Sequence, residues 1–203
     1  MSEFQEHNPI QENELNIIRR TIQINGTRPE DLDNAMVDKK IARSVDAKET
    51  MGKPGYFRPF YNNTNEAYGD WQVKNPEQIN LVWLSVSDLG FDHPTDIKEI
   101  YKVARERGLE LCPPSTVGYL SLALSDNPLP AGKYCIIATE LLDIGSSRDF
   151  KLFTLDQTDE KGEDVYISSA TVRPETTIEP PDRKYPVTLF ETNDKFVFVE
   201  PSK

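Results

Sequence analysis

The chain has 203 residues, of which 37% are hydrophobic and 28% are charged, and its formal net charge at pH 7 is -11. This composition is compatible with a packed core, because apolar runs of strand length remain between the polar stretches. The negative charge disfavours nonspecific binding to nucleic acid and to anionic membranes, since both carry the same sign.

The N-terminal sequence MSEFQEHNPIQENE is acidic and lacks the basic and apolar regions of a signal peptide. No run of the sequence approaches the roughly 18 apolar residues of a membrane-spanning helix. We therefore expect a cytoplasmic protein. Two cysteines do not make a disulfide framework. The acidic residues are spread along the chain, and a solvated surface accounts for them.

The first 50 residues predict a pair of helices. The first helix runs from Asn8-Pro9, which offers a cap and a proline, to a stop at Asn25-Gly26. Thr27 and Glu30 match a capping box that opens the second helix. The apolar positions are Leu15, Ile18 and Ile22 in the first helix, and Leu32, Met36, Ile41 and Val45 in the second. With so few apolar positions, the pair is either a partner-binding arm or an outer layer of the domain.

Residues 52–80 are rich in glycine, proline and asparagine, yet they hold several aromatic side chains close to Lys53, Arg58 and Lys74. Aromatic residues beside cations can stack on bases or sugars. An irregular segment also needs aromatic residues to anchor it to a core. The second interpretation is favoured, because stacking platforms usually accompany a basic groove.

The middle of the chain predicts a strand and a helix. The run INLVWLSV over 79–86 is apolar, rich in β-branched residues and of strand length. The clearest helix is expected over 95–107, with Gly108 placed to end it in a left-handed conformation. Its buried face consists of Ile97, Ile100, Tyr101 and Ala104.

The remainder of the chain reads as β-rich. Strands are expected over 120–124, 133–142, 150–155 and 165–172, and a final hairpin is expected to pair 187–191 with 196–200. The predicted fold class is therefore α+β: an antiparallel β-meander packed with one central helix, plus an N-terminal helical pair. The predicted division of the chain is a helical arm over 1–50 and an α+β domain over 51–203.

Cys112 resembles a nucleophile at first sight. A reactive cysteine needs a helix N-terminus or a nearby cation to lower its pKa. Cys112 instead follows a helix C-terminus and the alternating Leu109-Glu110-Leu111, and it precedes Pro113-Pro114. Free cysteine is among the most buried residue types. We therefore predict a buried, structural Cys112 at a change of chain direction.

No other pattern predicts a catalytic or metal site. The residues His7, His93, Cys112 and Cys135 lack the spacing of metal-ligand pairs. The Asp92-His93 pair has no nucleophile elbow in the neighbouring sequence. The run DQTDEKGED lacks calcium-loop spacing, and the glycine-rich loops that bind nucleotides do not occur. The sequence predicts no catalytic residue, no metal and no cofactor.

The stretch over 81–141 contains LVWLSVSDLGF, EIYKVARERGLELCP and LSLALSDNPLPAGKYCIIATELL. These motifs, with MGKPGY before them and KFVFVEPSK after them, resemble a family of uncharacterised bacterial proteins. The match departs from the family pattern at Asn127-Pro128 and at Thr139-Glu140-Leu141. The resemblance implies a bacterial origin, a cytoplasmic location and a structural Cys112, and it assigns no catalytic residue.

Two functions are compatible with these features. The first is a non-catalytic protein-binding module, of an interaction or inhibitor/immunity-like kind, whose partner is another protein. The acidic surface and the weakly amphipathic N-terminal pair favour it. The alternative is a small enzyme or small-ligand-binding domain with a pocket near the aromatic loop 56–71 and His93. The residues expected to line that pocket are Tyr68, Trp71, His93 and Tyr119.

Overall fold

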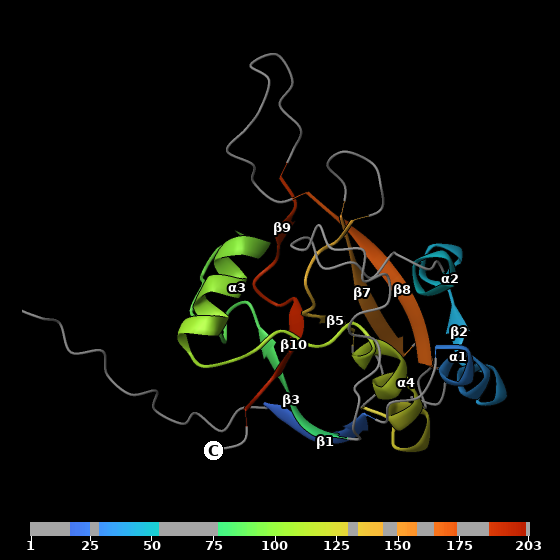
Figure 1. Cartoon of the computed structure of the whole chain (residues 1–203). Helices are drawn as coiled ribbons and strands as arrows, with labels where there is room; N and C mark the ends of the chain where they lie inside the picture. The colour runs from blue at the N-terminus through green and yellow to red at the C-terminus, as the bar shows by residue number, and fades with distance from the viewer. Residues whose placement is uncertain are drawn as a thin grey trace, which may run out of the picture.

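A computed structural model of the protein describes residues 17–24, 29–52, 77–129, 134–143, 150–157, 165–173 and 187–201. The helices lie in the first two thirds of the chain, and the described residues after α4 form strands only (Figure 1). The helices are α1 (Pro29–Asp38), α2 (Val45–Gly52), α3 (Ile97–Glu106) and α4 (Thr116–Asp126). The strands are β1 (Ile18–Ile24), β2 (Ala42–Arg43), β3 (Glu77–Ser85), β4 (Thr95–Asp96), β5 (Cys135–Ile137), β6 (Leu142–Asp143), β7 (Phe150–Gln157), β8 (Val165–Val172), β9 (Leu189–Phe190) and β10 (Lys195–Val199).

Eight of the strands form one mixed sheet. Its order is β1-β3-β10-β5-β7-β8-β2, and β6 pairs with β7 beside this path. β3 is antiparallel to both β1 and β10, whereas β10 is parallel to β5 and β2 is parallel to β8. β4 and β9 form a separate two-stranded sheet. The predicted α+β class is confirmed, but the sheet is mixed and not a simple antiparallel meander.

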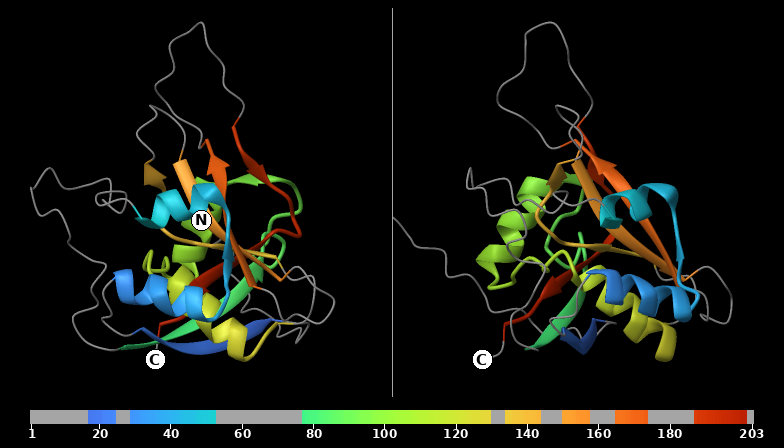
Figure 2. Two further views of the ribbon diagram at one scale, coloured as in Figure 1. Left: turned by 90° about the vertical axis from the view of Figure 1, so that its right-hand side faces the viewer. Right: turned by 45° about the vertical axis from the view of Figure 1, so that its right-hand side comes forward.

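Hydrophobic cores lie on both faces of this sheet. Along β3, Leu81 and Trp83 point into one core, while Val82 and Leu84 point into the other, as the two-residue period of a strand requires. In Figure 1 and in the right-hand view of Figure 2, α3 lies on one side of the sheet, and α1, α2 and α4 lie on the other. We call the two cores the α4 core and the α3 core. The α4 core includes Ile22, Ile24, Leu32, Met36, Leu120, Phe153 and Val197; the α3 core includes Ile97, Ile100, Tyr101, Leu152, Phe196 and Phe198.

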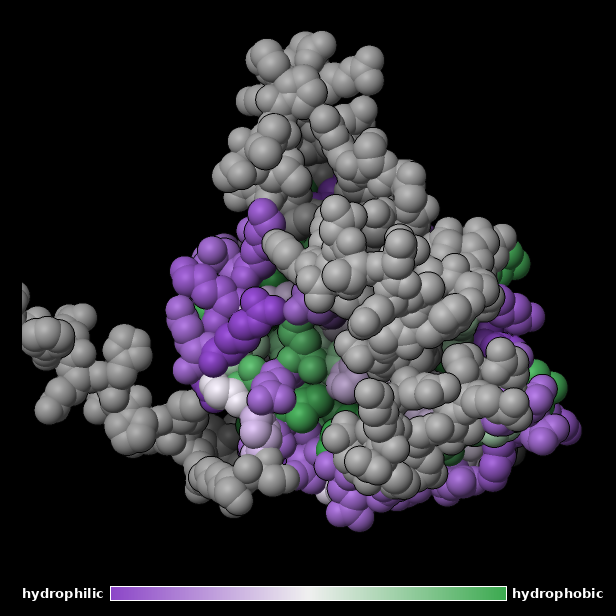
Figure 3. Space-filling model, in the orientation of Figure 1, coloured by the Kyte–Doolittle hydropathy of each residue, from purple (hydrophilic) through white to green (hydrophobic). Residues whose placement is uncertain are grey.

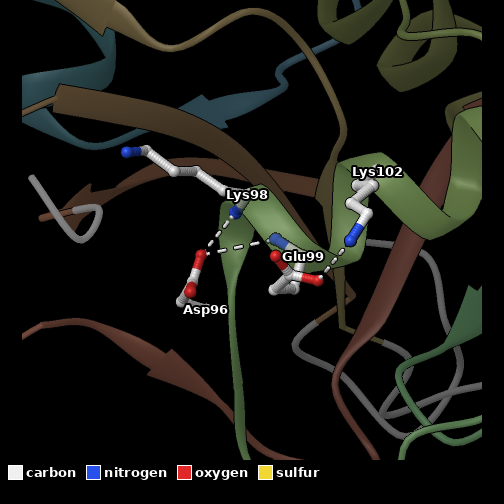
Figure 4. Close-up of polar contacts among 4 residues, drawn as sticks. All are labelled: Asp96, Lys98, Glu99 and Lys102. Carbon is white, nitrogen blue, oxygen red and sulfur yellow. Dashed lines mark hydrogen bonds and ion pairs between the residues drawn. The ribbon is translucent and has the colours of Figure 1, made fainter. Parts of the chain in front are cut away.

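The helix expected over 95–107 is confirmed as α3. Asp96 caps it, because its Oδ1 accepts hydrogen bonds from the backbone N–H of Lys98 at 2.6 Å and of Glu99 at 3.4 Å (Figure 4). Lys102 Nζ donates to Glu99 Oε2 at 3.4 Å on the exposed face. Gly108 has φ +78° at the end of the helix, as expected. Figure 3 shows that the outer surface of α3 is polar and that apolar surface lies beside it.

The helix predicted over 9–25 is wrong in its described part. Ile18–Ile24 form β1, which pairs antiparallel with β3 in the register Ile18↔Trp83 to Ile24↔Glu77. Ile18 and Ile22 are four residues apart and fit either period, but Ile24 continues only the two-residue period of a strand. The structure places Ile22 and Ile24 in the α4 core.

The second predicted helix is confirmed only in part. Pro29–Asp38 form α1, and the chain then passes through β2 into a separate helix, α2. Leu32 and Met36 are buried as expected, whereas Val45 is 71% exposed. The described residues on both sides of residue 50 therefore contribute to one core, as an outer layer would. A partner-binding arm over 1–50 stays a prediction.

The strand predicted over 120–124 is wrong, because Thr116–Asp126 form the helix α4. Leu120, Leu122 and Leu124 alternate like a strand, and this alternation misled the prediction. α4 lies between α1 and the sheet, and nearly all of its first two turns are buried. A helix that is enclosed on several sides is apolar all round and gives no clear helical stripe.

The expected final hairpin is also wrong. β9 pairs with β4, while β10 pairs with β3 and β5, so the two segments do not pair with each other. The strand expected over 133–142 is divided into β5 and β6. The strands expected at 79–86, 150–155 and 165–172 are confirmed as β3, β7 and β8. No helix in the described part of the chain is long and apolar enough to cross a membrane.

Candidate functional site

A groove runs between the outer strand of the sheet and two helices on the α4 side. Its volume is about 450 Å³. In Figures 1 and 2, α4 lies beside β1, and α1 lies against α4. The lining residues are Thr21, Ile22 and Gln23 of β1, Asp31, Leu32 and Ala35 of α1, and Tyr119, Leu122 and Ala123 of α4. The walls are therefore mostly apolar, with a carboxylate on one of the helices.

The register of β3 determines which backbone groups of β1 face outward. In a strand, the N–H and C=O of one residue point to the same side, and successive residues alternate between the two sides. The carbonyl of Asn80 accepts from the N–H of Glu200 at 2.8 Å, so the backbone of Asn80 points away from β1. Ile79 and Leu81 consequently point their N–H and C=O groups toward β1.

The same alternation leaves three residues of β1 facing the outer edge. Ile22 lies opposite Ile79, and Arg20 lies opposite Leu81. The backbone N–H and C=O groups of each pair therefore bond to each other across the two strands. Arg19, Thr21 and Gln23 therefore direct their N–H and C=O groups away from β3. β1 is the terminal strand of the sheet, and among the described residues no strand pairs with this outer edge.

Two arginines stand at the N-terminal end of this edge. Arg19 Nε donates to Glu200 Oε2 at 3.0 Å on the face of the sheet opposite the groove. Arg20 points to the groove side, where its Nη1 donates to the carbonyl of Asn127 at 2.6 Å. Partial burial lowers the pKa of the Arg20 guanidinium, because desolvation disfavours its charged form. β1 itself contains no acidic residue.

The two helices fix the two ends of the groove. Lys39, after α1, forms an ion pair with Asp126 at the end of α4, so the two helices end side by side. Gly118, near the start of α4, lies against Leu32, near the start of α1. Asp31 therefore lines the groove near the helix starts, while Arg20 and Asn127 mark the end where α4 stops.

The four predicted ligand residues do not form one described pocket. Tyr119 is buried in α4 and lines the groove. His93 lies in an exposed turn before β4, on the side of the α3 core. The sheet separates these two residues. Tyr68 and Trp71 lie outside the described residues, as do the whole aromatic loop 56–71 and most of the acidic turn after β7.

The Asp92–His93 pair is exposed. His93 Nδ1 and Asp92 Oδ1 are 2.7 Å apart, and this hydrogen bond lowers the pKa of the Asp92 carboxyl. His93 also contacts Phe91 edge-on, with ring centroids 6.4 Å apart. Both side chains of the pair are largely solvated, so this turn does not supply the desolvated setting that shifts a catalytic group strongly.

Cys112 is buried, as predicted. Its Sγ donates to the carbonyl of Val197 at 3.2 Å, and burial raises the pKa of the thiol well above its ordinary value. Cys135 is buried as well, and desolvation raises its pKa to about 12. Thiols of this kind are protonated at neutral pH and react slowly. Within the described residues, no three His, Cys, Asp or Glu side chains lie close enough to hold a metal ion.

The arginines and backbone groups of β1 were missed at the sequence level, because residues 18–24 were assigned to a helix. The alternation of Ile22 and Ile24 with Thr21 and Gln23 was the available sign of an edge strand. No family model matches the chain, and neither a curated protein nor a solved structure matches it. The family resemblance therefore remains an expectation.

Proposed function

We propose that the protein is a protein-binding module and that it contacts its partner through the outer edge of β1 and the adjoining groove. The observation that carries this proposal is the alternation along β1. It directs the N–H and C=O groups of Arg19, Thr21 and Gln23 away from the sheet, next to an apolar groove. An edge of this kind is the template for strand addition, in which an extended segment joins the sheet.

The energetics of strand addition suit this site. Each main-chain hydrogen bond contributes about 0.5–1.5 kcal/mol net, so hydrogen bonds alone give modest affinity. The groove supplies the remainder, because apolar side chains buried there gain roughly 25 cal/mol per Å². Leu32, Leu122 and Ala123 provide such apolar wall surface. The proposed contact therefore combines a sequence-independent backbone component with a side-chain component that selects the partner.

Thr21 offers a direct test of this function. Its N–H faces outward, so proline at this position removes a donor from the outer edge without breaking a bond to β3. Thr21→Val is the matched control. It keeps the outward N–H but, like Thr21→Pro, it loses the Thr21 hydroxyl, which donates to Asn80 Oδ1 at 2.7 Å. Both variants should fold.

Tagged full-length protein, Thr21→Pro and Thr21→Val are compared by affinity capture from lysate of the host cells. We expect one stoichiometric partner with the wild type and with Thr21→Val, and its loss with Thr21→Pro. A partner that stays bound to a folded Thr21→Pro variant would place the contact elsewhere. The cytoplasmic location and the inhibitor-like role remain expectations that the identity of the partner would decide.

A small-ligand site is the second candidate, and the position of Tyr119 favours it. The groove volume of about 450 Å³ falls within the range of ligand pockets, and Tyr119 is one of the residues that line the groove. A small ligand would not need the outer N–H of Thr21. Binding that survives Thr21→Pro and is lost on Leu122→Arg would therefore support this candidate over strand addition.

A further inference from the structure

We propose that the partner segment is an extended, acidic peptide, with carboxylates at the arginine end of β1 and apolar side chains toward the groove. This inference rests on the proposed function, since it names the chemistry of the segment that the same edge would bind. Two features of the site carry it: the charge of β1 and the shape of the groove.

The charge of β1 contrasts with that of the whole protein. The chain has a net charge of -11, yet β1 carries two arginines and no acid. The side chain of Arg19 is 58% exposed, and that of Glu200, with which it forms an ion pair, is 41% exposed. The Arg19 guanidinium is therefore accessible to a second carboxylate. Arg20 bonds a neutral carbonyl, that of Asn127, and is partly desolvated. A carboxylate beside Arg20 would stabilise its charged form.

The groove determines which side chains of an added strand are apolar. In a sheet, residues directly opposite each other point to the same face. Residues of the added strand opposite Arg20 and Ile22 therefore face the groove, while those opposite Arg19, Thr21 and Gln23 face the open side. The volume of about 450 Å³ is suited to a few valine-sized or leucine-sized side chains. The partner pattern is therefore alternating, apolar toward the groove and polar on the open side.

The two arginines indicate where the carboxylates lie. Arg20 marks the end of the groove where α4 stops, away from the starts of α1 and α4. A carboxylate of the partner near Arg19 or Arg20 would meet an opposite charge.

The inference is tested with two blocked synthetic peptides of the length of β1. Both peptides alternate threonine and valine. At the end that would lie beside Arg19 and Arg20, one peptide carries glutamate and the other carries lysine. Binding to the isotope-labelled full chain is followed by the amide shifts of β1, at low and at high salt. We expect the glutamate peptide to shift the amides of Arg19, Thr21 and Gln23 and to bind roughly fivefold tighter than the lysine peptide at low salt. High salt should reduce this preference.

The outcomes separate the inference from the proposed function. Equal binding of both peptides, abolished by Thr21→Pro, would overturn the acidic preference and leave strand addition at β1 intact. Shifts confined to residues outside β1, or no binding of either peptide, would overturn the inference; the capture experiment would then decide the function alone. The double variant Arg19→Gln, Arg20→Gln should abolish the preference for glutamate. An unchanged preference in that variant would also contradict the inference.

Discussion

At the scale of the residue, the buried cysteines make stability depend on pH in the alkaline range. Burial raises the pKa of Cys135 to about 12, whereas a thiol in the unfolded chain ionises near pH 8.5. Between these values the unfolded chain has lost a proton that the folded chain still holds. The free energy of unfolding therefore falls as the pH rises above about 9, by about 1.4 kcal/mol per pH unit for each such thiol.

The variant Cys135→Ala tests this dependence. Denaturant unfolding of the wild type and the variant is measured between about pH 8 and pH 11. We expect a shallower loss of stability in the variant, because one of the thiols that couple folding to alkaline pH has been removed. Tyr101, whose pKa burial also raises, contributes equally to both proteins. Parallel curves for the two proteins would show that the Cys135 thiol is not desolvated in the folded state.

Single residues also explain which parts of the candidate site the sequence could predict. Cys112 was predicted correctly, because its burial follows from local features, namely a helix end before it and two prolines after it. Arg19 and Arg20 were missed, because their roles depend on a strand whose apolar residues partly fit a helix. The placement of Tyr119 beside β1 depends on contacts between distant segments, which no local pattern contains.

At the scale of the element, the contact between α1 and α4 forms one wall of the groove and restricts Gly118. A Cβ at position 118 would lie 2.7 Å from Leu32 Cδ2, which is too close for an unstrained contact. We expect Gly118→Ala to destabilise the protein by about 1–3 kcal/mol through overpacking, although alanine is the better helix former. Denaturant unfolding measures this cost.

A double-mutant cycle assigns the cost of Gly118→Ala to Leu32. Leu32→Ala alone should cost about 2–4 kcal/mol, because it leaves a cavity in the α4 core. In that background Gly118→Ala should cost less than in the wild type, since the clashing side chain is gone. Equal costs in both backgrounds would mean that α1 and α4 do not pack as described.

Elements with a clear two-residue or helical period were predictable from the sequence. β7 and β8 have well-marked strand patterns, and α3 has a polar outer face and a buried face. α4 was not predictable in this way, because its position between α1 and the sheet makes most of its first two turns apolar. The pattern of a fully enclosed helix therefore resembles that of a buried strand.

At the scale of the whole molecule, the order of the strands in the sheet could not be predicted from the sequence. The last strand, β10, lies in the middle of the sheet, between β3 and β5. Phe196, Val197, Phe198 and Val199 are all buried, which is the pattern of a strand covered on both faces. That pattern indicates a central position but not which strands flank it, because pairing is decided by contacts between distant segments.

A deletion of residues 1–50 tests whether the rest of the chain needs this segment in order to fold. It removes β1, α1, β2 and most of α2, and it exposes the surface that Ile24 and Met36 now cover. We expect the shortened chain to lose cooperative thermal unfolding and well-dispersed amide shifts. A shortened chain that melts cooperatively near the wild-type temperature would instead support the arm and the boundary at residue 50.

The outward direction of alternate residues in β1 is the central claim, and amide hydrogen exchange on the free full chain tests it most directly. We expect slow exchange at Arg20 and Ile22, whose N–H groups bond to β3, and fast exchange at Arg19, Thr21 and Gln23. Slow exchange at Thr21 and its outward neighbours, equal to that at Arg20 and Ile22, would show that the edge is already covered and would contradict the proposed docking of a partner strand.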